Sequence, residues 1–340
     1  MADLRLKFVA GRHAGRFQAI FDGRVKPEGI ELNASVMPID ELFWRVPNVD
    51  DVDVAELSIT GYMWGIQHGK QWIALPVFPG WVFSCHTETL CNVDAGIEKP
   101  EDLKGKRVGV PEYPVTAITW IRDAFKTRYG VRPEDILWYE ERTAEYSHYR
   151  PQGYTPPEGV RVEIIPKEKR LCDMLIAGEL DAVTRYFGKP ENATATHPGD
   201  RSHIPLPKLG EHPKTRWLFA DRKAAAIQYH REIGFLQPIH CVIIKKEIAE
   251  KHPWAPLSLY NAFARAIALA AGVDYVSPHS YTLSKQEQVE VIGPDFSPAG
   301  LKANLPAITK ILTLCDQQGY VSRGRPFTVE EFFHASTLNT

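Results

Sequence analysis

The chain has 340 residues, of which 44% are hydrophobic and 24% are charged. This length exceeds that of most single-domain proteins, so two domains or one large domain are expected. The composition is that of a folded chain. The formal net charge of −2 gives no electrostatic reason to expect nucleic acid or an anionic membrane surface as a partner. Any anion binding must therefore come from locally placed Lys and Arg side chains.

Strand and helix patterns alternate along the first two thirds of the chain, which is typical of an α/β sheet. The apolar, β-branched runs predict strands at Leu4–Ala10, Ile30–Val36, Asp53–Ile59, Trp72–Phe78, Lys106–Val110, Val160–Ile165 and Leu180–Tyr186. Apolar residues at helical spacing predict helices at Ala117–Tyr129 and Lys169–Ala177.

The last third of the chain reads differently. The polar stretch Lys189–Lys214, rich in Pro, His and Asn, predicts a surface loop, and one more strand follows at Cys241–Lys245. Helices are then predicted at Pro256–Ala271, Lys285–Val291, Pro298–Gln318 and from Thr328 onward. The chain is expected to leave one domain, build a second and return, which gives a discontinuous domain of residues 1–90 plus 241–340 and a second of residues 91–240.

The N-terminal residues and the cysteines bear on the cellular compartment. The first residues, MADLRLKFVAGRH, alternate charged and apolar types and do not form a signal peptide, and no apolar run is long enough to span a bilayer. The five cysteines are odd in number and scattered, which is not a disulfide framework. We expect a cytoplasmic protein without membrane contact.

Several motifs of common enzyme classes are absent from the sequence. There is no GxSxG elbow, no HExxH pair, no Walker loop and no GxGxxG turn, which argues against hydrolase, ATPase and nicotinamide chemistry. The run CHTETLC (Cys85–Cys91) resembles a metal site, but structural zinc sites usually pair two ligand clusters, and no second Cys/His pair matches it. We expect no metal and no cofactor.

Six segments, taken in order, carry a family resemblance. They read DVAELSITGY (Asp53–Tyr62), LPVFPG (Leu75–Gly80), EDLKGKRVGVPEYPVTAITWIR (Glu101–Arg122), IPKEKRLCDMLIAGELDAV (Ile165–Val183), PIHCVIIKKEIAEKHPWAPLSLYNAF (Pro238–Phe263) and GPDFSPAGLKAN (Gly293–Asn304). Together they resemble the 4,5-dihydroxyphthalate decarboxylase family, which has the fold of type II periplasmic solute-binding proteins. The resemblance implies an α/β protein of two lobes with the ligand cleft between them.

The resemblance also implies an activity. It is cofactor-independent decarboxylation of 4,5-dihydroxyphthalate, or a close aromatic dicarboxylate, to 3,4-dihydroxybenzoate (protocatechuate) and CO2 in phthalate degradation. The alternative is a solute-binding protein for an aromatic carboxylate that serves a transporter or a sensor. The N-terminus favours the enzyme, because a binding component should carry an export or lipidation signal. We expect a homo-oligomer, since soluble enzymes commonly form one.

One segment departs from the family pattern. After LPVFP the family carries an Arg and then an Arg-His pair, whereas this chain reads GWVFSCH (Gly80–His86). His86 keeps a histidine there, but the basic neighbours are gone, so the sequence leaves open whether this segment contacts the substrate as in the family.

The segment GKRVGVPEYPVTAITWI (Gly105–Ile121) joins a strand to a helix without a phosphate loop. The N–H groups and dipole of a helix N-terminus attract a carboxylate without any such loop. Thr116 is predicted either to bind the substrate or to cap the helix. Glu112 and Tyr113 lie on the same loop, where they would contact the ring or its hydroxyls. The alternative is a surface Glu beside a half-buried Tyr.

Cationic side chains near strand ends are the candidate carboxylate anchors. GRHAGR (Gly11–Arg16) follows the first strand, and the carboxyl ends of strands are where open α/β sheets bind ligands. Solvated loop charges and structural salt bridges are the competing roles. The predicted substrate-binding residues are Arg12, His13, Arg16, Glu56, Ser58, Tyr113, Thr116, Arg185 and Tyr186.

Two histidines are the candidate proton donors. His240 comes just before the strand that returns to the first domain, and His86 lies at the other expected crossover. An imidazole exchanges a proton near neutral pH, although a structural histidine is the more common case for either one alone. We place His240, His86 and Glu112 in the catalytic set.

Overall fold

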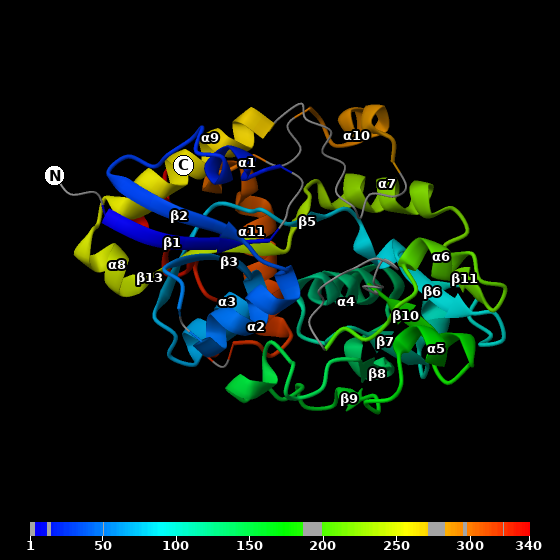
Figure 1. The fold of residues 1–340 in the computed structure, drawn as a ribbon. Helices are drawn as coiled ribbons and strands as arrows, with labels where there is room; N and C mark the ends of the chain where they lie inside the picture. The colour runs from blue at the N-terminus through cyan, green and yellow to red at the C-terminus, as the bar shows by residue number, and fades with distance from the viewer. Residues whose placement is uncertain are drawn as a thin grey trace. The chain divides into compact units, whose positions relative to one another are not determined.

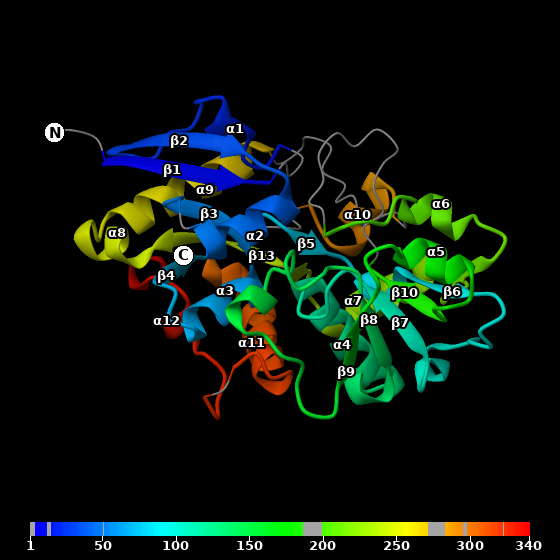
Figure 2. The same ribbon diagram turned by 60° about the horizontal axis from the view of Figure 1, so that its bottom comes forward.

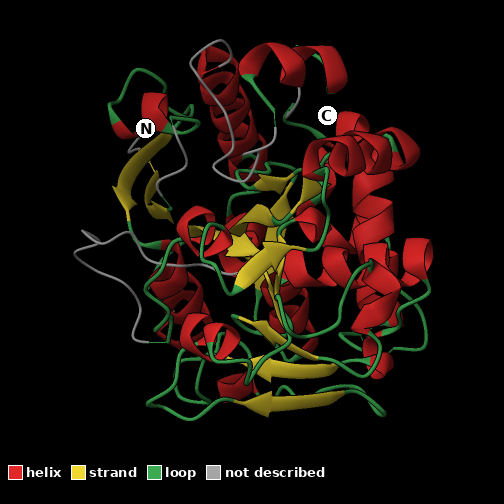
Figure 3. Ribbon diagram, turned by 90° about the vertical axis from the view of Figure 1, so that its right-hand side faces the viewer, coloured by secondary structure: helices red, strands yellow, loops and turns green. Residues whose placement is uncertain are grey.

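The computed structural model describes residues 4–11, 15–49, 51–185, 199–270, 283–294, 298–321 and 323–340. It mixes helices and strands throughout (Figure 3). The chain divides into two compact units, unit 1 with Met1–Phe83 and Ile233–Thr340 and unit 2 with Ser84–Glu232. The division is discontinuous, as the sequence predicts, and its boundaries fall slightly before the predicted residues 90 and 240. Each unit is described separately below.

Unit 1 is built on a five-stranded sheet (Figure 1). The strands lie in the order β2 (Ile30–Val36), β1 (Leu4–Ala10), β3 (Val54–Ser58), β13 (His240–Lys245) and β4 (Trp72–Leu75). β1 runs parallel to β2 and β3, whereas β13 is antiparallel to β3 and β4. A second, two-stranded sheet pairs β5 (Trp81–Val82) with β12 (Gln237–Pro238). The returning chain therefore enters the middle of the sheet at β13, next to the end of β3.

Helices complete unit 1. They are α1 (Gln18–Phe21), α2 (Ile39–Val49), α3 (Ile59–Gln67), α8 (Lys246–Lys251), α9 (Ala255–Ala270), α10 (Lys285–Val291), α11 (Leu301–Gln317) and α12 (Val329–Phe332), with a 3₁₀ turn at Ala335–Thr337. The α9 helix packs beside β1 and α1 (Figure 2). The rings of Phe8, Phe17 and Phe263 meet there at centroid distances of 4.9–5.7 Å. This aromatic contact holds β1 against α9.

Unit 2 is built on a six-stranded sheet. Its strands lie in the order β11 (Thr215–Trp217), β6 (Thr89–Asn92), β10 (Ala182–Thr184), β7 (Arg107–Val110), β8 (Leu137–Glu140) and β9 (Arg161–Ile164). The last four are mutually parallel, and β6 is antiparallel to β10 and β11. The helices are α4 (Thr116–Tyr129), α5 (Leu171–Ile176), α6 (Leu206–Gly210) and α7 (Arg222–Ile233), with 3₁₀ turns at Cys85–Thr87, Pro100–Leu103, Pro133–Asp135 and Arg150–Gln152.

The predicted surface loop Lys189–Lys214 needs a correction. Its described part contains α6, where Leu206 and Leu209 are buried in the core of unit 2. The prediction failed because a short helix of five residues leaves too few apolar positions to stand out from its Pro- and His-rich flanks. Residues 189–198 lie outside the described part.

No helix among the described residues is long and apolar enough to cross a membrane.

Candidate active site

The carboxyl ends of the parallel strands carry most of the predicted site residues. In unit 1, Gly11 follows β1, and Ser58 ends β3. In unit 2, the segment 111–115 follows β7, and Arg185 follows β10. Open α/β sheets bind ligands at these ends, because loops diverge there and leave room for a ligand. Each unit therefore has its own group of polar side chains at the carboxyl ends of its strands.

His240 and Glu56 form a hydrogen-bonded pair in unit 1. His240 Nδ1 lies 2.7 Å from Glu56 Oε1, and Glu56 Oε2 accepts a hydrogen bond of 2.9 Å from the Gly11 backbone N–H. Glu56 is fully buried, whereas the His240 side chain is 13% exposed. An ionised carboxylate only accepts hydrogen bonds, so we assign the hydrogen to Nδ1 of His240. Nε2 then carries no proton while the imidazole is neutral.

Gly80 lets the backbone approach the His240 ring closely. A Cβ atom on Gly80 would lie 2.8 Å from Cγ and 3.0 Å from Cε1 of the imidazole, and closer still to Nδ1. The Gly80 carbonyl also accepts a hydrogen bond of 2.9 Å from the N–H of Ile239. The edge of the Phe43 ring meets the imidazole at a centroid distance of 4.7 Å. The ring orientation of His240 is thus fixed by three neighbours as well as by its own strand.

Of the other predicted residues of unit 1, the structure describes Ser58 and Arg16. Ser58 is buried, and its hydroxyl lies 3.2 Å from that of Thr60. Ser58 is paired in register with His240 across β3 and β13. Arg16 is buried, only 4% exposed, just before α1. Arg12 and His13 lie outside the described residues.

Arg185 forms a buried ion pair with Glu88 in unit 2. Arg185 Nη1 donates to Glu88 Oε2 at 2.7 Å, and both side chains are 2% exposed. Burial raises the pKa of Glu88, and the Arg185 charge opposes that rise. Arg185 also has a left-handed backbone with φ of 49°, which costs a non-glycine residue about 1–2 kcal/mol. The ion pair, the competing role considered for Arg185, helps to offset that cost. Tyr186 lies outside the described residues.

Glu112 lies inside a buried polar network. It accepts hydrogen bonds from the Ser147 hydroxyl, from Arg142 Nη1 at 3.2 Å and from the His148 backbone N–H at 3.2 Å. Burial raises the pKa of Glu112 to about 7, and the Arg142 charge opposes this rise. Arg142 is shared with Asp200, which it binds through two nitrogens at 2.7 and 2.9 Å. Glu112 thus joins the loop after β7 to residues 142–148, and no part of it is exposed.

Tyr113 and Thr116 are also buried at this junction. The N–H of Tyr113 donates to Glu140 Oε1 at 2.8 Å, and its carbonyl accepts from Arg122 Nη1 at 2.6 Å. The Arg122 guanidinium stacks 3.8 Å from the centre of the Tyr113 ring. The N-cap of α4 is Val115, so Thr116 is the first residue inside the helix and the capping role considered for it is wrong.

His86 lies among aromatic side chains of unit 2. Its ring centroid is 4.5 Å from that of Tyr229 and 5.3 Å from that of Phe219, and the residue is 1% exposed. Neither ring nitrogen has a hydrogen-bond partner among the described residues. Burial, together with the charge of Arg128, lowers the pKa of His86 to about 3. His86 is therefore neutral at pH 7, whereas a general acid works best with a pKa near the operating pH.

The two cysteines of the run Cys85–Cys91 are buried in the protein interior. Cys85 and Cys91 are fully buried, and burial raises the pKa of each thiol to about 12. Thiolates are the form that binds metal, so this environment disfavours a metal here.

Sequence reasoning missed three residues that support the site. The sequence patterns include Gly80 only within LPVFPG and GWVFSCH, Glu88 only within CHTETLC, and Gly11 only at the start of GRHAGR. A glycine between apolar residues does signal a close backbone approach, so Gly80 offered a usable signal. The partners of Gly11 and Glu88, which lie 45 and 97 residues away in the sequence, gave none.

Sequence comparisons place the chain in a family. No family model matches it. It is 29% identical over 347 residues to a 4,5-dihydroxyphthalate decarboxylase from Comamonas testosteroni, which covers 100% of this chain and 99% of that protein. It is 32% identical over 242 residues to a 4,5-dihydroxyphthalate decarboxylase from Pseudomonas putida, which covers 71% of this chain and 87% of that protein. The chain belongs to the 4,5-dihydroxyphthalate decarboxylase family. This confirms the resemblance, and the chain is accordingly an enzyme of the carboxy-lyase class.

Structure comparisons confirm the fold. A putative sulfonate-binding protein from Methylobacillus flagellatus has a TM-score of 0.56 at 10% identity and covers 100% of this chain and 94% of its own. The ligand-binding component of an import system from Staphylococcus aureus has a TM-score of 0.53 at 11% identity and covers 99% and 98%. A desulfurization enzyme has a TM-score of 0.51 at 14% identity and covers 99% and 98%. This decarboxylase family member therefore has the periplasmic-binding-protein fold, which serves both binding proteins and an enzyme.

Proposed function

We propose that this protein removes CO2 from 4,5-dihydroxyphthalate, or a close aromatic dicarboxylate, to give 3,4-dihydroxybenzoate without a cofactor. The observation that carries the proposal is the near-complete alignment with a 4,5-dihydroxyphthalate decarboxylase. The His240–Glu56 pair supports it, because the reaction needs a proton donor and a histidine hydrogen-bonded to a carboxylate can supply a proton.

The chemistry of the ring defines what the protein must do. A base removes the proton of the hydroxyl para to the departing carboxylate, and the resulting phenolate pushes electron density to the carbon that bears that carboxylate. A general acid protonates this carbon, and the C–C bond then breaks to release CO2 while its electron pair restores the aromatic ring and the phenolate. The phenolate regains a proton, so the net reaction consumes one proton and releases one CO2.

His240 is the proposed general acid. Its Nδ1–H donates to the buried Glu56 carboxylate, and this interaction stabilises the imidazolium that donates from Nε2. Glu56 itself is held by the Gly11 N–H. The proposal gives Glu56 a positioning role and does not require His86, whose pKa of about 3 makes it a poor proton carrier at pH 7.

The carboxylate that stays on the ring needs cationic or N–H partners. We propose Arg12, Arg16 and Arg185 for this task, with Thr116 and the N–H groups that begin α4 as further donors. A guanidinium has five N–H donors, so the bond from Arg185 to Glu88 does not by itself use up its capacity. Cytoplasmic placement and a homo-oligomer remain part of the proposal.

A direct test mixes the purified protein, with and without a chelator, with 4,5-dihydroxyphthalate and follows CO2 release alongside the ring absorbance. We expect release in both samples. Substrate binding without turnover would instead support a solute-binding protein for an aromatic carboxylate, the function that the neighbours in the binding-protein fold favour.

His240→Gln is the decisive variant. It removes the transferable proton and keeps a side chain of similar size, so it should lower kcat by about 100-fold or more while the affinity for substrate changes little. The matched control is His252→Gln in the same unit, which changes a histidine outside the proposed site and should keep full turnover. Unchanged kcat in His240→Gln would remove His240 from the mechanism.

A further inference from the structure

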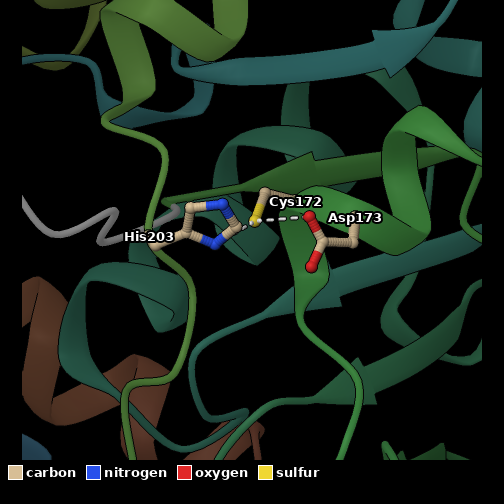
Figure 4. Close-up of side chains that lie close together, drawn as sticks. All are labelled: Cys172, Asp173 and His203. Atoms are coloured by element: carbon tan, nitrogen blue, oxygen red, sulfur yellow. Dashed lines mark hydrogen bonds between the residues drawn. The ribbon is translucent and has the colours of Figure 1, made fainter.

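Three potential metal ligands come together in unit 2, and none of them belongs to the proposed active site. Cys172 and Asp173 begin α5, and His203 lies in the segment before α6. One ligand atom from each lies within 4.8 Å of the other two. Cys172 Sγ is 3.6 Å from Asp173 Oδ1 and 3.7 Å from His203 Nδ1 (Figure 4). Figure 4 shows the sulfur between the carboxylate and the imidazole.

The two distances from the sulfur match two edges of a tetrahedral zinc site, and the third edge, between Asp173 and His203, lies within 4.8 Å. Zinc binds a thiolate sulfur at about 2.3 Å and an imidazole nitrogen or carboxylate oxygen at about 2.0 Å. At the tetrahedral angle, such bonds place the sulfur about 3.5–3.6 Å from each of the other ligand atoms. The observed 3.6 and 3.7 Å need almost no rearrangement of Cys172. The donor set of one sulfur, one nitrogen and one oxygen also favours zinc over magnesium or calcium, which prefer oxygen ligands alone.

A buried carboxylate holds the two segments together. Glu141 accepts hydrogen bonds from the Leu171 N–H at 3.2 Å, from the Arg201 N–H at 3.0 Å and from the Ser202 hydroxyl. Leu171 directly precedes Cys172, and Ser202 directly precedes His203. Glu141 is 2% exposed, so this link is protected from water. The approach of His203 to α5 is thus fixed by the fold and does not depend on exposed side chains.

We propose that Cys172, Asp173 and His203 bind a zinc-type divalent cation, with water as the fourth ligand. Cys172 is fully buried, whereas Asp173 and His203 are exposed, so the ion would enter from solvent and reach the sulfur last. The thiol proton leaves to solvent as the metal–sulfur bond forms. The ion would link α5 to the segment before α6, and the inference is independent of the proposed decarboxylation.

Arg170 competes with the ion. Its Nη1 lies 3.2 Å from His203 Nδ1 and 3.8 Å from Asp173 Oδ2. The Arg170 side chain is 48% exposed, so it can swing into solvent when a cation arrives. The site therefore has a cationic side chain over it, and removing that charge should strengthen metal binding.

The test uses the full-length, tag-free protein after dialysis against a chelator, because a histidine tag would itself bind zinc. Zn2+ binding is measured by calorimetry, and Co2+ is used as a spectroscopic probe. We expect one ion per chain, a thiolate-to-Co2+ charge-transfer band in the near ultraviolet and a raised melting temperature with Zn2+. Cys172→Ser should abolish the band, and His203→Gln and Asp173→Asn should each weaken binding by about 100-fold or more.

Two further variants make the test specific. Cys91→Ser changes another buried thiol of the same unit and should keep the band. Arg170→Gln should tighten Zn2+ binding by about tenfold, since it removes a positive charge next to a divalent ion. If Cys172→Ser keeps the band, or if Zn2+ binds equally in wild type and all three ligand variants, the site is refuted and the ion is adventitious. Decarboxylation enters none of these readouts, so failure here leaves the proposed function untouched.

Discussion

Replacing Gly80 with Ala tests whether the His240 imidazole must stay where the structure places it. Gly80 is not among the residues with positive φ, so alanine meets no backbone penalty there. Its Cβ would lie 2.8 Å from His240 Cγ and 3.0 Å from Cε1, against an ordinary contact of about 3.5 Å. The ring must therefore withdraw by at least about 0.7 Å.

A shift of that size disrupts the bond to Glu56. The Nδ1–Oε1 distance is 2.7 Å, and a hydrogen bond of this kind weakens beyond about 3.2 Å. A displacement near 1 Å of a catalytic group can cost about 100-fold in rate. We therefore expect Gly80→Ala to lower kcat for CO2 release by about 100-fold, with a loss of unfolding free energy of about 1–3 kcal/mol from overpacking.

Gly65→Ala provides the matched control. Its Cβ would lie 2.6 Å from a ring carbon of Trp72, which is a comparable clash in the same unit with no histidine involved. Thermal unfolding and steady-state CO2 release are measured for both variants. The reasoning is refuted if Gly80→Ala and Gly65→Ala lose similar stability and both keep kcat within about threefold of wild type.

Three further predictions concern the other titratable groups. Glu56→Gln keeps the size of the side chain but loses the charge that stabilises the imidazolium, so kcat should fall by about 100-fold with little change in KM. An unchanged pH–rate profile would contradict the positioning role of Glu56. His86→Phe should keep full turnover and remove two buried nitrogens without partners. The pKa of His86 is about 3 in the folded state and near 6.5 in the unfolded state, so between these values the unfolded state binds more protons and wild-type stability falls as pH drops. Denaturant melts at pH 4 and 7 should therefore show a smaller difference in unfolding free energy for the variant than for wild type. Glu112 has the opposite sign, since burial raises its pKa to about 7, above its ordinary value of 4.5, so the folded state binds more protons in that window. Stability should therefore fall as pH rises from about 4.5 to 7, and Glu112→Gln should remove part of that slope; an unaltered slope would refute this reasoning.

Local patterns predicted much of the fold. β1, β2 and α10 have the predicted bounds. Alternating apolar and polar residues mark the two strands, and a serine-led capping box marks the start of the helix. The α2 and α7 helices were missed. The α2 helix contains Pro47, which normally ends a helix, and α7 buries only a few scattered positions in the described structure, which leaves a weak helical periodicity.

The sequence predicted where the candidate site residues lie, but not which residues they pair with. Strand ends pointed to Glu56, Ser58 and His240, since ligand sites in α/β sheets lie there. The contact between His240 and Glu56 joins residues 184 apart, and the approach of His203 to Cys172 joins residues 31 apart. Periodicity reports which face of an element is buried and carries no information on such long-range pairs. The role of Glu56 as partner of His240 therefore became visible only in the structure.

The fold alone does not decide between binding and catalysis, because it is shared with a sulfonate-binding protein and with a desulfurization enzyme. A binding protein needs a set of donors for its ligand at a strand end, and a buried carboxylate behind a histidine orients one such donor and favours its charged form. Glu56 is fully buried, and the two hydrogen bonds described for it reach His240 and Gly11. Burying a carboxylate is costly unless it is paired, and His240 and the Gly11 N–H supply that pairing for Glu56. This arrangement is explained if the imidazole must become charged and neutral in turn, which is the demand that protonating a ring carbon makes.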